Sequence, residues 1–316
     1  MSAVWEPGER GGPLVSLILV TYNSARLLPA FFDALAGTRY APYELIAVDN
    51  ASADGTAEEL ARRPGVRLLA NAANVGFGRA CNQGARAASG SLLVFLNPDV
   101  LVTPLWLDAL TERMAQHPDA AIISPQTVAP GEARAAPEPA ERRAVEAAAV
   151  PGCAMMMRRC AWEQLGGFDE QIFLYWEDTE LCWRAWLCGW RVLEDLEATV
   201  VHTRGASGGG AQWDAEAVKN GLYVHLKLLG WRPVARFAAR QAAKTALRLA
   251  SGRGGALLDA WRWNLRHLGE TLARRRELRR HARGDLRHLE QLIAAHTARQ
   301  RRERSERQAI RHHHEP

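Results

Sequence analysis

The chain has 316 residues, of which 47% are hydrophobic and 24% charged, a composition that indicates a globular protein and excludes a disordered one. This length allows one large α/β domain with an appendage, or two domains. Five cysteines without a CxxC pair favour reduced thiols over a disulfide framework. Cys182 and Cys188, six residues apart, fit small apolar helix positions better than a metal-binding pair.

The charge is unevenly distributed along the chain. The net charge is +5, yet residues 1–211 hold 17 Lys and Arg against 25 Asp and Glu, whereas residues 212–316 hold 23 against 10. No apolar run approaches the roughly 18 residues of a membrane-spanning helix. Residues 1–13 lack the basic-then-apolar pattern of a signal peptide, so we expect a cytoplasmic protein with a basic C-terminal extension.

The first part of the chain alternates strand and helix patterns. Short apolar, β-branched runs predict buried strands at 16–23, 44–50 and 92–99. Helices are predicted at 54–63, with Asp54 as a candidate cap and Thr56–Glu59 at capping-box spacing, and from Thr103–Pro104 to about residue 117. Repeated βα units predict a mostly parallel sheet with helices on both faces.

The second part is less regular. The Pro- and Ala-rich stretch 129–144 is interpreted as a mobile loop. A strand is predicted at 152–159, and the short helix after it should end at Gly166–Gly167. Two short strands are expected within 191–205. From residue 213 the pattern is helical and basic, and residues 298–316 are predicted to be disordered.

Polar residues follow each predicted N-terminal strand. They are Thr21 and Asn23 after the first strand, Asp49, Asn50 and Ser52 after the second, and Asn97 and Asp99 after the third. Ligands of open α/β sheets bind outside the carboxyl ends of the strands. These three groups therefore predict a ligand site at one edge of the sheet.

Two adjacent acids, Glu177 and Asp178, stand in the aromatic segment FLYWEDTELCWRAW at 173–186. Neighbouring helical side chains point about 100° apart, so the two acids should have different roles. Acids in a first helical turn can also serve only to stabilise the helix dipole. Trp183 and Trp186 fall at the helical spacing of core residues.

The motifs TYN (21–23), VDNASADGT (48–56), NVGFGRACNQG (74–84), FLNPDV (95–100), GGFDE (166–170) and FLYWEDTELCWR (173–184) occur in that order. Over about residues 14–230 they resemble family 2 glycosyltransferases, most closely the bacterial rhamnosyltransferase-like branch. The resemblance implies a GT-A fold, a Rossmann-like, mostly parallel central sheet flanked by helices, over residues 14–211. A basic helical region at 212–297 and the tail at 298–316 would follow.

The resemblance also implies a nucleotide-sugar donor and a divalent cation, Mg²⁺ or Mn²⁺. Asp49 would accept a hydrogen bond from the nucleobase, although it can also be a turn acid. Asp99 and His202 would bind the metal, although a histidine after a strand is often only structural. The other expected donor-binding residues are Thr21, Asn23, Asn50, Ser52, Asn74, Gly76, Arg79 and Asn97. Asn97 departs from the family's first metal-binding acid, and on charge alone Arg79 could equally be a solvated helix residue.

The implied reaction is an inverting displacement in which Asp178 is the general base for the acceptor hydroxyl. Glu177 would orient the acceptor or its loop. Trp176 and Tyr175 would stack on an acceptor sugar or belong to the core. The expected reaction moves a deoxysugar, such as rhamnose from dTDP-rhamnose, to a glycan or lipid-linked acceptor in surface polysaccharide synthesis.

Two other functions stay open. A nucleotide-sugar-binding homologue without turnover would fit Asn97 but not the intact acid pair. An oxidoreductase is disfavoured because no GxGxxG follows the first strand. The basic region, exemplified by 225–249, could lie on an anionic membrane surface, form a helical hairpin for self-association, or bind nucleic acid. We do not expect a nucleic-acid partner, since no recognised module for one is present.

Overall fold

A computed structural model describes residues 12–131, 144–203 and 211–298. The expectations for the N-terminal tail, for most of the 129–144 loop and for the C-terminal end fall on residues outside these ranges.

A nine-stranded mixed sheet forms the centre of the molecule, in the order β3-β2-β1-β4-β8-β6-β9-β5, with β7 paired to β9. The first half is parallel, since β1 pairs with β2 and β4, and β2 pairs with β3. In the second half β8 runs antiparallel to β4 and β6, whereas β6 and β9 are parallel. The strand bounds are β1 Val15–Thr21, β2 Tyr43–Asp49, β3 Val66–Ala70, β4 Leu92–Leu96, β5 Val100–Val102, β6 Ala120–Val128, β7 Ala144–Glu146, β8 Ala154–Arg158 and β9 Arg191–His202.

Helices α1 to α6 cover the two faces of this sheet. Alternating strand residues point to opposite sides, so Leu17 and Leu19 of β1 enter one core whereas Ile18 and Val20 enter the other. The core that contains Leu17 is closed by α1 (Leu28–Ala36), α2 (Thr56–Ala61) and α4 (Trp106–Gln116). The core that contains Ile18 is closed by α3 (Phe77–Ala87), α5 (Arg159–Leu165) and α6 (Glu177–Leu187).

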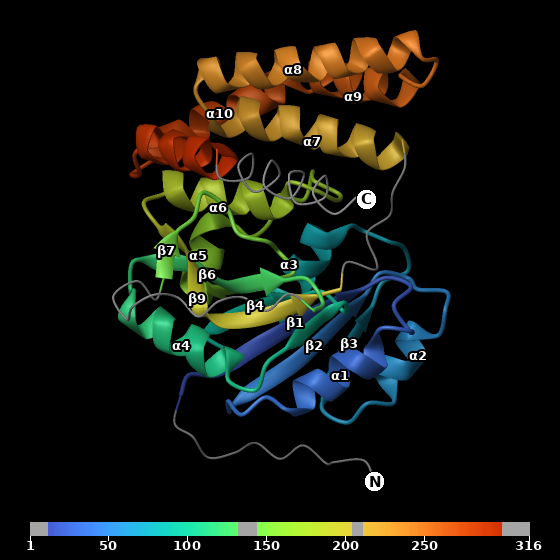
Figure 1. Cartoon of the computed structure of the whole chain (residues 1–316), viewed down its shortest axis with the longest axis vertical. Coiled ribbons are helices and arrows are strands. Elements are labelled where there is room, and N and C mark those ends of the chain that lie inside the picture. The colour runs from blue at the N-terminus through green and yellow to red at the C-terminus, as the bar shows by residue number, and fades with distance from the viewer. Residues whose placement is uncertain (1–11, 132–143, 204–210, 299–316) are drawn as a thin grey trace, which may run out of the picture.

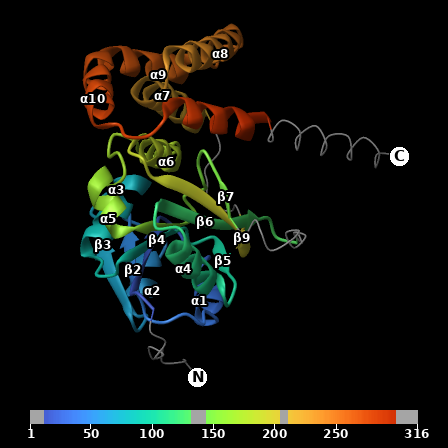
Figure 2. The same ribbon diagram turned by 90° about the vertical axis from the view of Figure 1, so that its left-hand side faces the viewer.

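The C-terminal helices form a further layer over α6, on the far side from α1 and α2 (Figures 1 and 2). They are α7 (Ala211–Leu228), α8 (Trp231–Ala250), α9 (Gly255–Arg266) and α10 (Leu268–His281), followed by helical residues 286–298. Tyr223, Val224 and Leu228 of α7 belong to the same hydrophobic core as α3 and α6. The first of the basic helices is therefore packed into the sheet-containing body.

Most predicted elements are present, and several details differ. Helix α4 begins at Trp106, two residues beyond Pro104. Thr56 lies inside α2 and makes no capping box, whereas Asp54 accepts a hydrogen bond from its N–H over 3.2 Å. The 191–202 segment is one strand rather than two, with an irregular register opposite β6. Strands β3, β5, β6 and β7 were not predicted from the sequence.

Candidate active site

The Asp49 carboxylate holds the ends of β1 and β2 together. Thr21 donates to its Oδ1 over 2.8 Å, and Ser52 donates its N–H to Oδ2 over 2.9 Å and its hydroxyl to Oδ1 over 2.6 Å. Asn23 joins the same turn, because its N–H donates to the Ser52 hydroxyl over 2.8 Å. Asp49 therefore acts as the turn acid that holds residues 49–52 in place. Because three hydrogen bonds already reach its carboxylate, about one of its four lone-pair positions is left for a nucleobase.

The next residues that were expected to bind the nucleotide-sugar form a second group around the start of α3. The Asn50 side chain donates to the Gly76 carbonyl over 3.3 Å, and Asn74 accepts the Gly76 N–H over 3.0 Å. Asn71, which the sequence did not single out, donates to Asn50 over 2.9 Å. Asn50 and Asn71 thus join the end of β2 to the loop before α3.

Gly76 is required for a close approach between this loop and the aromatic–acid segment. Its φ is +88°, and a Cβ there would lie 2.5 Å from the Phe173 carbonyl oxygen. The same carbonyl accepts the N–H of Phe77 over 3.0 Å. No other residue tolerates both the positive φ and the contact, so Gly76 fixes the donor-side loop against residues 173–176.

Arg79 points elsewhere. Its guanidinium lies 3.3 Å from the Glu170 carboxylate and also donates to the Glu170 backbone carbonyl. Asn82 in the next turn donates to the Phe168 carbonyl over 2.9 Å, in keeping with a structural residue. The structure thus places Arg79 on the GGFDE loop rather than with Asn74 and Gly76.

Asp99 and His202 lie together at the ends of β4 and β9. Asp99 is 3% exposed, and its Oδ1 lies 3.1 Å from His202 Nε2. The hydrogen bond to Asp99, and then the contact with Cys153, raise the pKa of His202 to about 10. A cation shared by the two would displace the His202 proton. Within the part of the chain that the structure describes, no three His, Cys, Asp or Glu side chains form a metal-binding group.

As a pair of metal ligands, Asp99 and His202 fit Mg²⁺ or Mn²⁺ bound jointly with a substrate. Such hard cations commonly take one or two protein ligands and complete their shell with phosphate oxygens and water. Asn97 adds no carboxylate; its N–H donates to the Cys153 carbonyl over 3.0 Å. Asp99 and His202 could hold such a cation only with phosphate present.

The two acids open α6, as predicted, and differ in environment. Asp178 accepts the Gly152 N–H over 3.1 Å and the Thr179 N–H and hydroxyl over 2.5 and 3.1 Å. Burial raises its pKa, and these hydrogen bonds oppose the rise. Burial and then the charge of Asp178 raise the pKa of Glu177 to about 8, and its Oε2 has no hydrogen-bond partner within the described structure.

Backbone strain is concentrated in this region. Among the described residues other than glycine, positive φ occurs at Asn23, Ala51, Tyr175 and Trp176, with values of 49°, 60°, 67° and 77°. Two of these follow strands β1 and β2, and the other two directly precede Glu177. Such strain persists where the surrounding structure enforces it, and it is common at functional sites.

Tyr175 and Trp176 are held by α7. Asn220, 1% exposed, donates to the backbone carbonyls of Leu174 and Tyr175 over 2.9 and 3.2 Å. The Trp176 ring packs edge-on against Trp183, at a centroid distance of 6.0 Å, and against rings of α7 and α8, whereas Tyr175 packs against Trp213. Trp183 and Trp186 are core residues, as predicted.

A buried ion network attaches the same helix to α6. Lys227 of α7 lies 2.6 Å from the Asp169 carboxylate and 2.7 Å from Glu180, which also pairs with Arg184 at 2.6 Å. Tyr223 donates to Asp169 over 2.6 Å. The pKa values of Asp169 and Glu180 are lowered because these cations outweigh the effect of burial. No role for these residues or for Asn220 was predicted from the sequence.

The chain is similar in sequence and in fold to known glycosyltransferases. Residues 16–188 match the family model described as "Glycosyl transferase family 2". The chain is 28% identical over 242 residues to "N-acetylglucosaminyl-diphospho-decaprenol L-rhamnosyltransferase" of Mycobacterium tuberculosis, covering 62% of this chain and 78% of the relative. It is 29% identical over 228 residues to "O-antigen biosynthesis protein RfbC" of Myxococcus xanthus, of which it spans only 18%.

Two solved glycosyltransferases share the fold. The mannosyltransferase PcManGT from Pyrobaculum calidifontis, solved with GDP-Man and Mn²⁺, is 20% identical with a TM-score of 0.56, over 92% of this chain and 88% of that one. S. aureus TarS 1–349, solved with UDP-GlcNAc, is 16% identical with a TM-score of 0.58, over 78% and 79%. The match over more than half of the chain, together with the sheet and its strand-end residues, shows that this protein belongs to glycosyltransferase family 2 and has the GT-A fold.

Proposed function

We propose that this glycosyltransferase is metal-dependent and inverting, and that it moves a deoxysugar, rhamnose from dTDP-rhamnose, to a glycan or lipid-linked acceptor in surface polysaccharide synthesis. The similarity to an L-rhamnosyltransferase supports the sugar and the acceptor class. The observation that carries the proposal is the position of the Asp178 carboxylate, which accepts a hydrogen bond from the Gly152 N–H. The next residue, Cys153, accepts the N–H of Asn97 at its carbonyl.

In this proposal Asp178 takes the proton of the acceptor hydroxyl as the oxygen attacks the anomeric carbon. The bond to the nucleoside diphosphate breaks on the opposite side, which inverts the anomeric configuration. Burial favours this role, because a carboxylate with a raised pKa is a better proton acceptor. Glu177, with a pKa of about 8, stays largely protonated at neutral pH and supports the loop rather than accepting the proton.

The donor would lie along the strand ends. Thr21, Asn23, Asp49, Asn50 and Ser52 form the nucleoside side. Asn74 and Gly76 present the loop before α3, where backbone N–H groups suit phosphates. Asp99 and His202 would hold the cation, which supplies positive charge to the leaving diphosphate. Arg79 could reach the donor only by leaving Glu170.

The basic helices suggest that the enzyme binds its acceptor at a membrane surface. No helix in the described ranges combines the length and apolar character needed to cross a bilayer. Trp231, Leu247 and Leu265 of α8 and α9 are nevertheless 60%, 74% and 69% exposed on a strongly basic region. We propose that this basic region rests on anionic lipid. A truncation near residue 225 cuts into α7 and would unfold the core, so salt-dependent release of the full chain from phosphatidylserine vesicles is the better measurement.

A panel of nucleotide-sugars tested for protection against thermal unfolding, with and without Mn²⁺, separates these functions. We expect dTDP-rhamnose to raise the melting temperature, and Mn²⁺ to increase the shift, because a ligand that binds only the folded state stabilises it. A donor that binds without any transfer would favour a non-catalytic homologue, which the Asn97 departure suggests. No shift with any donor would contradict the proposal.

A further inference from the structure

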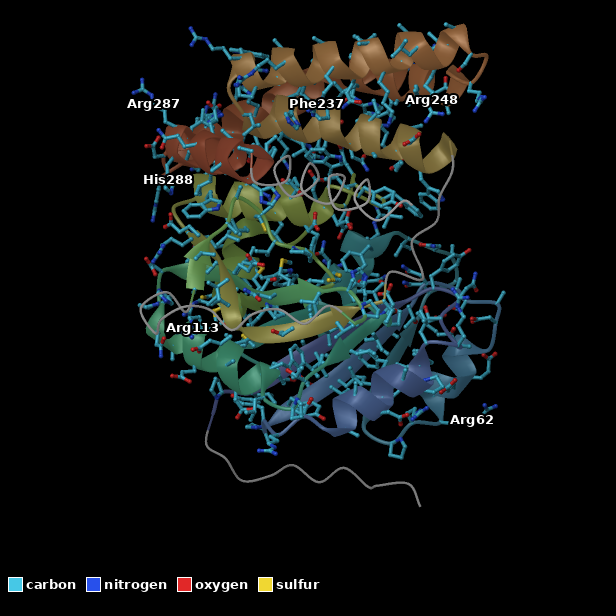
Figure 3. The ribbon with its side chains drawn as sticks, viewed as in Figure 1. Arg62, Arg113, Phe237, Arg248, Arg287 and His288 are labelled. Atoms are coloured by element: carbon cyan, nitrogen blue, oxygen red, sulfur yellow. The ribbon has the colours of Figure 1, made fainter. Side chains whose placement is uncertain are left out.

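A cavity of about 420 Å³ lies between the catalytic segment and the C-terminal helices. Its floor is aromatic: Trp176 and Trp183 from the catalytic segment, His225 of α7 and Phe237 of α8. Phe237 points from α8 towards α7 (Figure 3), and its ring stacks on His225 with centroids 3.9 Å apart. Burial lowers the pKa of His225 to about 4, so the floor is uncharged at neutral pH.

Arg240 and His296 stand at the rim of the cavity. Both are exposed, and Arg240 lies one turn beyond Phe237, with its guanidinium 5.3 Å from the Phe237 ring. None of the described residues that line the cavity is acidic. An uncharged aromatic floor beneath a basic rim suits a molecule that has both an apolar part and an anionic group.

The cavity also adjoins the candidate base. Thr179 lines it, and the Thr179 hydroxyl donates to Asp178 over 3.1 Å. Trp176, directly before Glu177, forms part of its floor. A Cβ on Gly221 of α7 would lie 2.6 Å from Phe237 and 3.1 Å from Trp176, so only a residue without a side chain lets these two rings meet. A molecule in this cavity would contact Thr179, which follows the proposed base in the chain.

We propose that this cavity binds the unreactive end of the acceptor, an apolar chain against the aromatic floor with its phosphate or diphosphate at Arg240. The inference rests on the proposed function and locates its acceptor. The volume lies within the usual range for small-molecule sites, about 300–1,000 Å³, and accommodates the first few isoprene-sized units rather than a complete long chain. The basic region around α8, proposed above to rest on anionic lipid, would lie next to the part of the cavity where the apolar chain enters.

Farnesyl diphosphate is a suitable probe, with farnesol and inorganic diphosphate as its separate parts. We expect calorimetry on the full chain to detect farnesyl diphosphate and to find each part weaker. Arg240→Gln should raise the Kd of farnesyl diphosphate about tenfold, the usual effect of one charge-assisted hydrogen bond. Arg236→Gln, one turn earlier on the same helix and outside the cavity lining, is the matched control and should leave the Kd unchanged.

A cavity-filling variant tests the apolar half. Ala149 lines the cavity, so Ala149→Leu should weaken farnesyl diphosphate severalfold and leave dTDP-rhamnose protection intact. Equal affinities for wild type and Arg240→Gln, or inorganic diphosphate binding as tightly as farnesyl diphosphate, would overturn the inference. Donor protection without farnesyl diphosphate binding would overturn it while leaving the proposed function standing. The absence of donor protection would instead contradict the proposed function.

Discussion

The backbone N–H of Gly152 donates a 3.1 Å hydrogen bond to the Asp178 carboxylate. The next carbonyl along the chain, that of Cys153, accepts the N–H of Asn97, and the Cys153 thiol is close enough to His202 to raise its pKa. A two-residue segment therefore connects the proposed base with the proposed metal site. In the proposed mechanism this connection would set the distance between the attacking and leaving sides of the reaction.

Gly152→Ala tests that connection. A Cβ at this position would lie 3.2 Å from the Asp178 Cβ, so the acid must shift by a few tenths of an ångström. We expect kcat to fall about tenfold or more, since small misplacements of reacting groups are costly, with donor protection unchanged. Gly269→Ala in α10 meets no atom within 4 Å and is the control. Equal kcat values for the two variants would exclude a positioning role for Gly152.

Asp99→Ala should remove the Mn²⁺-dependent part of donor binding. The substitution removes the carboxylate of the proposed metal-binding pair, and His202 loses its 3.1 Å contact with Asp99. The melting-temperature shift from dTDP-rhamnose should then be equal with and without Mn²⁺. The exposed α9 acid Asp259, replaced by Asn, should keep the full effect of the metal. An undiminished response to Mn²⁺ in Asp99→Ala would place the cation elsewhere.

Glu177→Gln should stabilise the protein in a pH-dependent way. The pKa of Glu177 is about 8 in the folded protein against an ordinary value of 4.5, so the folded state holds an extra proton between these pH values. The free energy of unfolding therefore falls as pH rises through this range. Glutamine does not ionise, and we expect a gain of about 2–4 kcal/mol at pH 8 with little at pH 4.5. Urea unfolding at both pH values measures this; an equal effect at the two would refute the assignment.

Lys227→Met should destabilise the attachment of α7 to α6. Two carboxylates within 2.7 Å, those of Asp169 and Glu180, would lose a buried cation, at a cost of about 3 kcal/mol. Lys244→Met breaks only a half-exposed pair with Asp214, so it should cost less than about 1 kcal/mol. Urea unfolding compares the two variants. Similar losses would mean that the network contributes little.

Local patterns in the sequence were sufficient to predict three strands of the parallel half of the sheet, β1, β2 and β4, and the placement of the acids. Strands β1, β2 and β4 are short apolar runs, and the polar residues after them meet at one edge because parallel strands end on the same side. The start of α6 at Glu177 follows from the same local reasoning.

The contribution of α7 was missed because its contacts join residues 46 and 58 positions apart, as in Asn220–Leu174 and Lys227–Asp169. A usable signal was nevertheless present. Asn220, Tyr223, Val224 and Lys227 fall at i, i+3, i+4 and i+7, the spacing of a core-facing stripe. Polar residues at such positions imply buried partners, although the sequence does not identify them. Similarly, Arg79 could be paired with Glu170 only once the fold was known.

The most direct test of the proposed mechanism is sugar transfer by Asp178→Asn, measured in single turnover from dTDP-rhamnose to a lipid-linked acceptor. Asparagine keeps the shape of the side chain and cannot take the proton, so we expect transfer to fall by about 10²–10⁴. Donor protection should be unchanged. Asp259→Asn, which alters an exposed acid on α9, should transfer at the wild-type rate. Wild-type transfer by Asp178→Asn would contradict the assignment of Asp178 as the base.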